Sequence, residues 1–117
     1  MSKAENAIKY ACLDILKARG WYARLNHVGL YRLCKGKKVM ITIGGKGEGD
    51  ILAISPVGRL IWVETKIPGG GFKESQLDFA EEMRTRGVPC VAIDDPPKLT
   101  AWLDERREWL EVGADGA

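Results

Sequence analysis

The stretch of sequence that decides the fold is residues 47–66, which read GEGDILAISPVGRLIWVETK. Two runs rich in apolar and β-branched residues, 51–54 and 60–63, flank the tripeptide Pro56-Val57-Gly58. A three-residue hairpin loop built on a type I turn favours proline early and glycine last. The pattern therefore predicts a β-hairpin with its turn at residues 56–58.

The predicted turn also fixes which residues face each other across the hairpin. If Ser55 pairs with Arg59, counting outward along the two strands sets Asp50 opposite Glu64. Side chains alternate along a strand, so Lys66 lies on the same face as Glu64. Two carboxylates and one ammonium group are therefore expected to converge on one patch.

The two strands of this hairpin are apolar on both faces. One face carries Leu52, Ile54, Leu60 and Trp62, and the other carries Ile51, Ala53, Ile61 and Val63. Strands of this kind are usually covered on both sides, often by helices. The hairpin therefore predicts an α/β fold.

The patch of Asp50, Glu64 and Lys66 favours a bound cation. Carboxylates that face each other in a partly buried site cost free energy unless positive charge compensates them. Mg²⁺ prefers one or two carboxylates with carbonyl and water oxygens, and a lysine beside it can orient or deprotonate an attacking water. A cross-strand salt-bridge cluster on a solvated face is the alternative. The shared register within apolar strands favours the metal site.

Length and composition indicate one intracellular domain. The chain has 117 residues, 45% hydrophobic and 29% charged, with a net charge of +2, which is ordinary for a globular protein. Three scattered cysteines and a single histidine, His27, argue against a disulfide framework or a zinc site. No apolar run is long enough for a bilayer. We expect a soluble protein in a reducing compartment, with a frayed tail at 113–117.

The rest of the chain predicts further helices and strands around the hairpin. Apolar residues recur at helical spacing over 2–19 and again over 73–86. A strand or strand-like loop is expected over 21–33, a strand parallel to the Glu64 strand over 88–93, and a last helix over 100–110. Asp94-Asp95-Pro96-Pro97 between the last two is typical of a turn rather than a metal site.

An Asp on one strand followed by Glu-x-Lys on the next, here Asp50 and Glu64-Thr65-Lys66, resembles the metal-dependent nuclease core called PD-(D/E)XK. The Gly-x-x-Asp approach to Asp50 and the helical Ser75-Gln76 pair resemble the VRR-NUC family within that superfamily. The family commonly has proline before its first aspartate, where this chain has Gly49, a difference expected to loosen the start of the strand. The resemblance implies a restriction-endonuclease-like core over 1–112, with a small mixed β-sheet flanked by helices.

The resemblance also implies roles for individual residues. Mg²⁺ or Mn²⁺ would be held by Asp50, Glu64, the backbone carbonyl of Thr65 and an acidic residue at the place of Glu5. Glu5 lies on the inward stripe of the first helix, but Ser2 and Glu5 also match a capping box, and the two roles can coexist. Lys66 would position water. Gln76, which faces the sheet, would orient that water or the phosphate; a buried structural amide is the alternative.

Basic residues before the hairpin predict contacts with a nucleic-acid backbone. The candidates are Lys35, Lys37, Lys38 and Lys46, together with Lys73 and Ser75 at the start of the second helix. A charged, solvated loop is the alternative for the first four. Ser75 is expected to cap the helix or contact phosphate rather than act as a nucleophile, since no triad is visible. No Walker arrangement follows the glycines, so we expect no nucleotide cofactor.

The function implied by the resemblance is a metal-dependent DNA endonuclease, with a preference for branched or junction DNA in replication, repair or recombination. Standalone members of the family look like junction-cleaving homodimers, and a chain this small has little surface for gripping a duplex alone. The alternative is a non-catalytic nucleic-acid-binding or assembly module that retains the nuclease fold.

Overall fold

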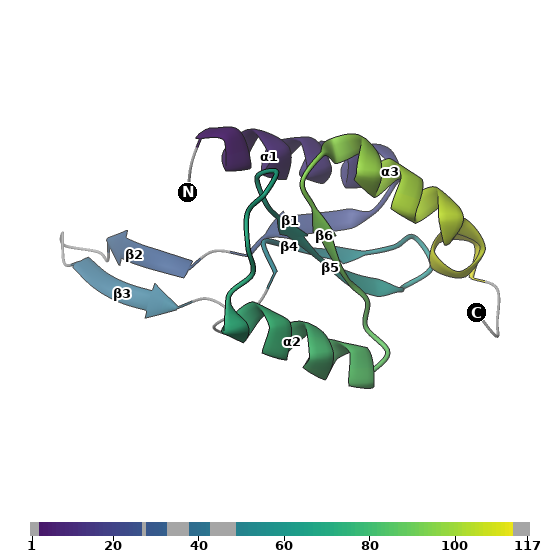
Figure 1. Ribbon diagram of the computed structural model, residues 1–117. Coiled ribbons are helices and arrows are strands. Elements are labelled where there is room, and N and C mark those ends of the chain that lie inside the picture. The colour runs from purple at the N-terminus through teal and green to yellow at the C-terminus, as the bar shows by residue number, and fades with distance from the viewer. Residues whose placement is uncertain (1–2, 27, 33–37, 43–48, 114–117) are drawn as a thin grey trace.

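The structure is a computed structural model that describes residues 3–26, 28–32, 38–42 and 49–113. Four strands form one mixed sheet in the order β1-β4-β5-β6, with helices on both of its faces (Figure 1). The elements of this body are α1 (Lys3–Ala18), β1 (Tyr22–Leu25), β4 (Ile51–Ile54), β5 (Leu60–Thr65), α2 (Glu74–Thr85), β6 (Cys90–Ile93) and α3 (Pro96–Glu105). Among the helices of the described residues, none has the length and apolarity to cross a membrane.

The central hairpin of β4 and β5 has the predicted turn and register. The Ser55 backbone N–H donates to the Arg59 carbonyl at 2.8 Å, and the Gly58 N–H donates to the Ser55 carbonyl at 2.9 Å. Gly58 has φ of 89°, the left-handed conformation that the end of this loop requires. Leu52 pairs with Trp62, as counting outward from the turn predicts.

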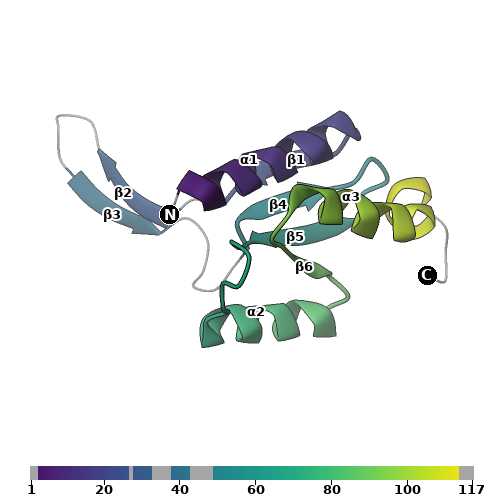
Figure 2. The same ribbon diagram turned by 45° about the horizontal axis from the view of Figure 1, so that its top comes forward.

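The two faces of the sheet are covered unequally. The face that carries Ile51, Ala53, Ile61 and Val63 is fully buried, and α1 and α3 pack on this side (Figure 2). The opposite face is only partly covered, because α2 lies towards β6 and, in the described chain, none of its side chains is fully buried. The expected covering by helices therefore holds completely for one face and partly for the other.

The segment predicted as one strand over 21–33 is two strands in two different sheets. β1 pairs antiparallel with β4, whereas β2 (Val28–Arg32) pairs, among the described strands, with β3 (Lys38–Thr42) alone. The pair β2–β3 projects from the body as a separate arm (Figure 1). The change occurs at Asn26, whose N–H donates to the Asp50 carbonyl at 2.8 Å. That bond lies at the end of the β1–β4 ladder, and the chain continues into the arm beyond it.

The C-terminal region corrects two expectations. The predicted strand over 88–93 is β6, and it is parallel to β5 as expected. The last helix, however, begins at Pro96 rather than Thr100, with prolines in its first turn, where their missing N–H groups are not needed. It ends at Glu105 and is followed by a π-helical turn over Glu108–Val112. Asp94 and Asp95 form the bend between β6 and α3, where Asp95 is the N-cap of the helix and Asp94 forms an ion pair with Lys98 at 2.8 Å.

Candidate active site

Asp50 lies at the open end of the hairpin and is fixed by Thr65. Its Oδ2 accepts hydrogen bonds from the Thr65 backbone N–H at 2.8 Å and from the Thr65 Oγ1 hydroxyl at 2.7 Å. Thr65 is 1% exposed, so this contact holds the Asp50 carboxylate against the core. The N–H and carbonyl of a strand residue point to the same side, which directs the Thr65 carbonyl towards Asp50. The anchoring role of the Thr65 side chain was not predicted from the sequence.

Gln76 connects the other two residues of the predicted patch. Its Nε2 donates to Glu64 Oε1 at 2.8 Å, and its Oε1 accepts from Lys66 Nζ at 2.9 Å. Lys66 Nζ lies 3.7 Å from Glu64 Oε1. The Gln76 Oε1 also accepts from the Lys73 backbone N–H at 2.9 Å, at the start of α2. Gln76 therefore ties Glu64, Lys66 and the helix start into one network.

The sequence predicted that Gln76 faces the sheet, but the bridge itself was missed. A glutamine three residues after the N-cap is the position from which a side chain reaches back to the first backbone N–H. That spacing from Lys73 was the available signal. The bridge is consistent with both roles considered for Gln76, since it supports the helix and also lies on the site.

The site around Glu64 holds more negative than positive charge. The pKa of Glu64 is raised from its ordinary value of 4.5 to about 7, and burial is the largest cause of this net shift. Within that shift, the negative charge of Asp50 also raises the pKa, Lys66 lowers it, and the charge of Glu5 makes the smallest contribution. Two carboxylates that share a partly buried site with one ammonium group favour an additional cation.

The donor set fits a small divalent cation that takes oxygen ligands. In the part of the chain that the structure describes, no three His, Cys, Asp or Glu side chains gather closely enough to hold a metal together. Mg²⁺ needs only one or two carboxylates and completes its shell with carbonyl, water and phosphate oxygens. Asp50, Glu64 and the Thr65 carbonyl provide such a set. Direct ligation by Glu5, which is half-buried in the first turn of α1, stays a prediction.

Only two of the residues predicted to bind nucleic acid have described side chains. Lys73 is exposed and Ser75 is half-buried at the start of α2, where both line a shallow depression with Glu74 and Asp78. The others, together with His27, cannot be placed at the site: Lys35, Lys37, Lys46 and His27 lie outside the described residues, and for Lys38 only the course of its strand is described.

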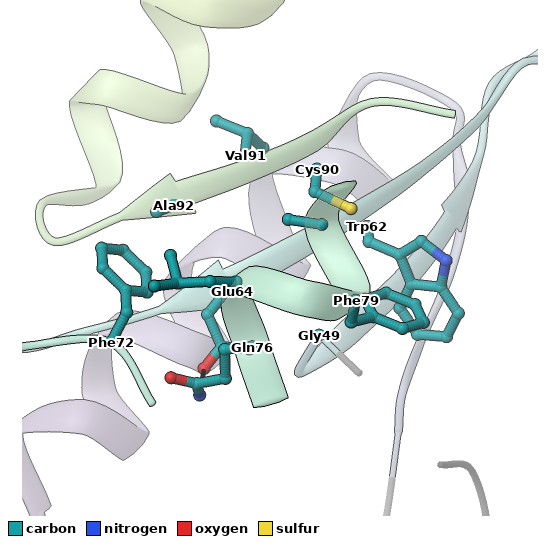
Figure 3. Close-up of a pocket in the computed structure, with 11 residues that line it drawn as sticks. Gly49, Trp62, Glu64, Phe72, Gln76, Phe79, Cys90, Val91 and Ala92 are labelled. Atoms are coloured by element: carbon teal, nitrogen blue, oxygen red, sulfur yellow. Dashed lines mark hydrogen bonds between the residues drawn. The ribbon is translucent and has the colours of Figure 1, made fainter. Parts of the chain in front are cut away.

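An apolar cavity of about 170 Å³ adjoins the site between α2 and the sheet. Figure 3 shows Glu64 and Gln76 near its middle, Phe72 at one end, and Trp62 with Phe79 at the other. Trp62 and Phe79 meet edge to face, with ring centroids 5.3 Å apart. The cavity was not predicted from the sequence, because it arises from the incomplete covering of this face by α2.

Gly49 lets the chain pass close to β5 immediately before Asp50. A Cβ atom at Gly49 would lie 3.1 Å from the Val63 carbonyl oxygen and 3.3 Å from the Trp62 Cβ. The residue is buried, and its carbonyl accepts from the Asn26 side-chain amide at 3.3 Å. The expectation that glycine loosens the start of the strand is therefore wrong, since the position is closely packed.

We expect Gly49→Ala to lower the free energy of unfolding by about 1–2 kcal/mol, because the added methyl group overpacks a backbone contact. Gly71→Ala is the matched control, since a Cβ at Gly71 would meet no atom of the described residues within 4 Å. Urea denaturation followed by tryptophan fluorescence measures both. Equal stability of the two variants would contradict the close packing at Gly49.

Comparisons with known proteins bear on the fold. A solved structure described as a "VRR_NUC domain" matches with a TM-score of 0.67, covering 88% of this chain and 97% of its own chain at 20% sequence identity. The match confirms the predicted fold, a VRR-NUC-like α/β core of the restriction-endonuclease type. No family model matches the sequence, and a search of curated proteins finds no match.

Proposed function

We propose that this protein is a metal-dependent nuclease that hydrolyses internal phosphodiester bonds in DNA. The observation that carries the proposal is the hydrogen-bonded group of Glu64, Gln76 and Lys66, which lies at the open end of the hairpin beside Asp50. The VRR-NUC-like fold supports the proposal, because it is the fold implied by the family resemblance from which the roles of these residues were predicted. Branched DNA as the preferred substrate and a homodimer as the active form belong to the same proposal.

Each residue of the site would have a separate role in the reaction. Asp50, Glu64 and the Thr65 carbonyl would hold Mg²⁺ or Mn²⁺, with Glu5 adding negative charge nearby. When bound, the metal supplies Lewis-acid stabilisation of the phosphate and a water of lowered pKa. The Lys66 ammonium orients the attacking water or stabilises the charge that develops on the phosphoryl oxygens. Gln76 holds Lys66 and Glu64 at a fixed separation, which preserves this geometry without reorganisation.

Cleavage assays test the proposal. Labelled duplex, single-stranded, flap and four-way-junction DNA are incubated with Mg²⁺, Mn²⁺ or a chelator. We expect cutting with either metal, none with the chelator, and a loss of about 100-fold or more for Asp50→Asn, because a ligand charge is removed. Asp14→Asn, an exposed change on α1, is the control and should cut normally. Intact DNA in every lane, with binding indifferent to metal, would instead favour a non-catalytic binding module.

A further inference from the structure

Phe72 is an exposed aromatic residue, and the chain on both sides of it forms local hydrogen bonds. It lies in the loop between Lys66 and α2 and is 47% exposed. Before it, the Gly70 N–H donates to the Ile67 carbonyl at 2.9 Å, with Gly69 at φ of 82°, which is a type II turn. After it, Gln76 caps the Lys73 N–H. The chain on both sides of Phe72 is therefore ordered by local hydrogen bonds.

The Phe72 ring lies directly beside the predicted catalytic lysine. Lys66 Nζ lies 5.4 Å from the centroid of the ring, within the range of a cation–π contact. Phe72 also lines two separate cavities: the apolar one next to Glu64 and a second, more polar one of about 270 Å³ that includes Lys66. The ring therefore stands at the boundary between an apolar space and the charged end of the site.

The apolar cavity has the size and lining for one flat ring. Its volume of about 170 Å³ is below the range of roughly 300–1,000 Å³ that is usual for drug-sized ligands. Its walls include Trp62, Phe79 and Ala80, and Leu77, which also lines it, is 56% exposed. Glu64 and Gln76 supply its polar lining. A ligand with a planar apolar body and a polar edge matches this lining.

We infer that Phe72 and the adjoining apolar cavity bind an unpaired nucleobase of DNA, next to the phosphate that Lys66 contacts. The inference rests on the proposed nuclease function and adds a substrate feature to it. A nucleotide joins a phosphate to a flat base, and Phe72 places an aromatic surface beside the cation that would meet the phosphate. In an intact duplex both faces of a base are covered by its neighbours, so only an unpaired or displaced base can stack here.

Single exposed aromatic residues are common on protein surfaces and need no ligand. Phe72 differs because local hydrogen bonds order the chain on both sides of it, Lys66 lies over its ring, and it lines a cavity together with Glu64 and Gln76. A second copy of the chain covering this surface is the competing occupant. The experiments below are chosen to separate the two.

Binding is measured with DNA that carries 2-aminopurine in an unpaired stretch, using Mg²⁺ and the Asp50→Asn background so that cleavage is slow compared with the measurement. We expect the fluorescence of the unpaired 2-aminopurine to be quenched on binding, and Phe72→Ala to abolish the quenching and weaken binding of unpaired DNA by roughly tenfold. Phe72→Trp should preserve both, whereas Phe72→Leu should not. Tyr10→Ala removes another exposed aromatic residue, 53% exposed on α1, and should change neither.

Cleavage by the otherwise unaltered protein gives the second readout. Phe72→Ala should lower kcat/KM for flap or single-stranded DNA by roughly tenfold and leave fully paired duplex nearly unchanged. Equal losses on both substrates, or full activity of Phe72→Leu, would overturn the base site. Light scattering that shows a dimer dissociated by Phe72→Ala would overturn it as well, because the surface would then be an interface between copies.

The outcomes also separate this inference from the proposed function. Cleavage that is indifferent to Phe72 on every substrate overturns the base site and leaves the nuclease standing. Quenching that depends on Phe72, in a protein that cuts no DNA with any metal, supports the base site and overturns the nuclease.

Discussion

Glu64→Gln is expected to abolish metal-dependent cleavage and, at the same time, to stabilise the metal-free protein at pH 8. The loss of activity follows because the carboxylate is one of two side chains proposed to hold the metal, and an amide carries no compensating charge. We expect at least a hundredfold fall in rate. The gain in stability follows because a partly buried negative charge is removed while its hydrogen bond from Gln76 can still form.

The sign of the stability effect comes from the pKa of Glu64. Its folded-state pKa of about 7 is above the ordinary 4.5, so the folded protein binds more protons than the unfolded chain between these values. The free energy of unfolding therefore falls as pH rises from about 4.5 to about 7 and stays lower above that. With an allowance for solvent screening, the fall is about 1–2 kcal/mol. In Glu64→Gln this part of the pH dependence disappears.

Urea denaturation in chelator at pH 5, 6, 7 and 8 measures this difference, and cleavage of the substrate preferred by the unaltered protein measures the activity. Glu74→Gln, which changes an exposed glutamate in α2, is the control for the loss of one negative charge and should alter neither quantity. A Glu64→Gln variant that is active with Mg²⁺, or less stable than the unaltered protein at pH 8, would contradict the proposed role of this carboxylate.

The fold and the centre of the site could be predicted where local rules and long-range structure agree. The Pro56-Val57-Gly58 turn fixes the hairpin, and the hairpin fixes the register that brings Asp50 to the strand of Glu64 and Lys66. Strand alternation then decides which side chains share a face. None of these steps requires knowledge of residues far away in the sequence.

The features that the sequence did not predict depend on how separate elements meet. The division of residues 21–33 into β1 and β2 depends on Asn26 bonding to the Asp50 carbonyl. The cavity beside Glu64 depends on how far α2 covers the sheet, and the Gln76 bridge depends on where α2 begins. The periodicity of apolar residues indicates that a helix or strand exists and which of its faces is apolar. It does not fix how two such elements are positioned relative to each other. The position of α2 relative to the sheet determines both the cavity and the Gln76 bridge.

Lys66→Met is expected to lower the cleavage rate by a factor of about 10² to 10⁴, the range typical of a lost general acid–base or charge-stabilising group. Methionine keeps most of the length and apolar body of lysine but removes the ammonium that donates to Gln76 and lies 3.7 Å from Glu64. The rate under single-turnover conditions, with saturating Mg²⁺ and DNA, separates this chemical effect from binding. Lys17→Met, an exposed change on α1, should cut normally.

Lys66→Arg distinguishes the two roles considered for the ammonium. Arginine keeps the positive charge but is a planar fork that does not give up its proton. If Lys66 acts through charge alone, Lys66→Arg should retain a substantial part of the activity that Lys66→Met loses. If Lys66 must accept a proton from water, both variants should fall equally. If either variant binds DNA with an affinity close to that of the unaltered protein, its loss of activity arises in the chemical step and not from weaker binding of the substrate. Full activity of Lys66→Met would show that Lys66 takes no part in the reaction.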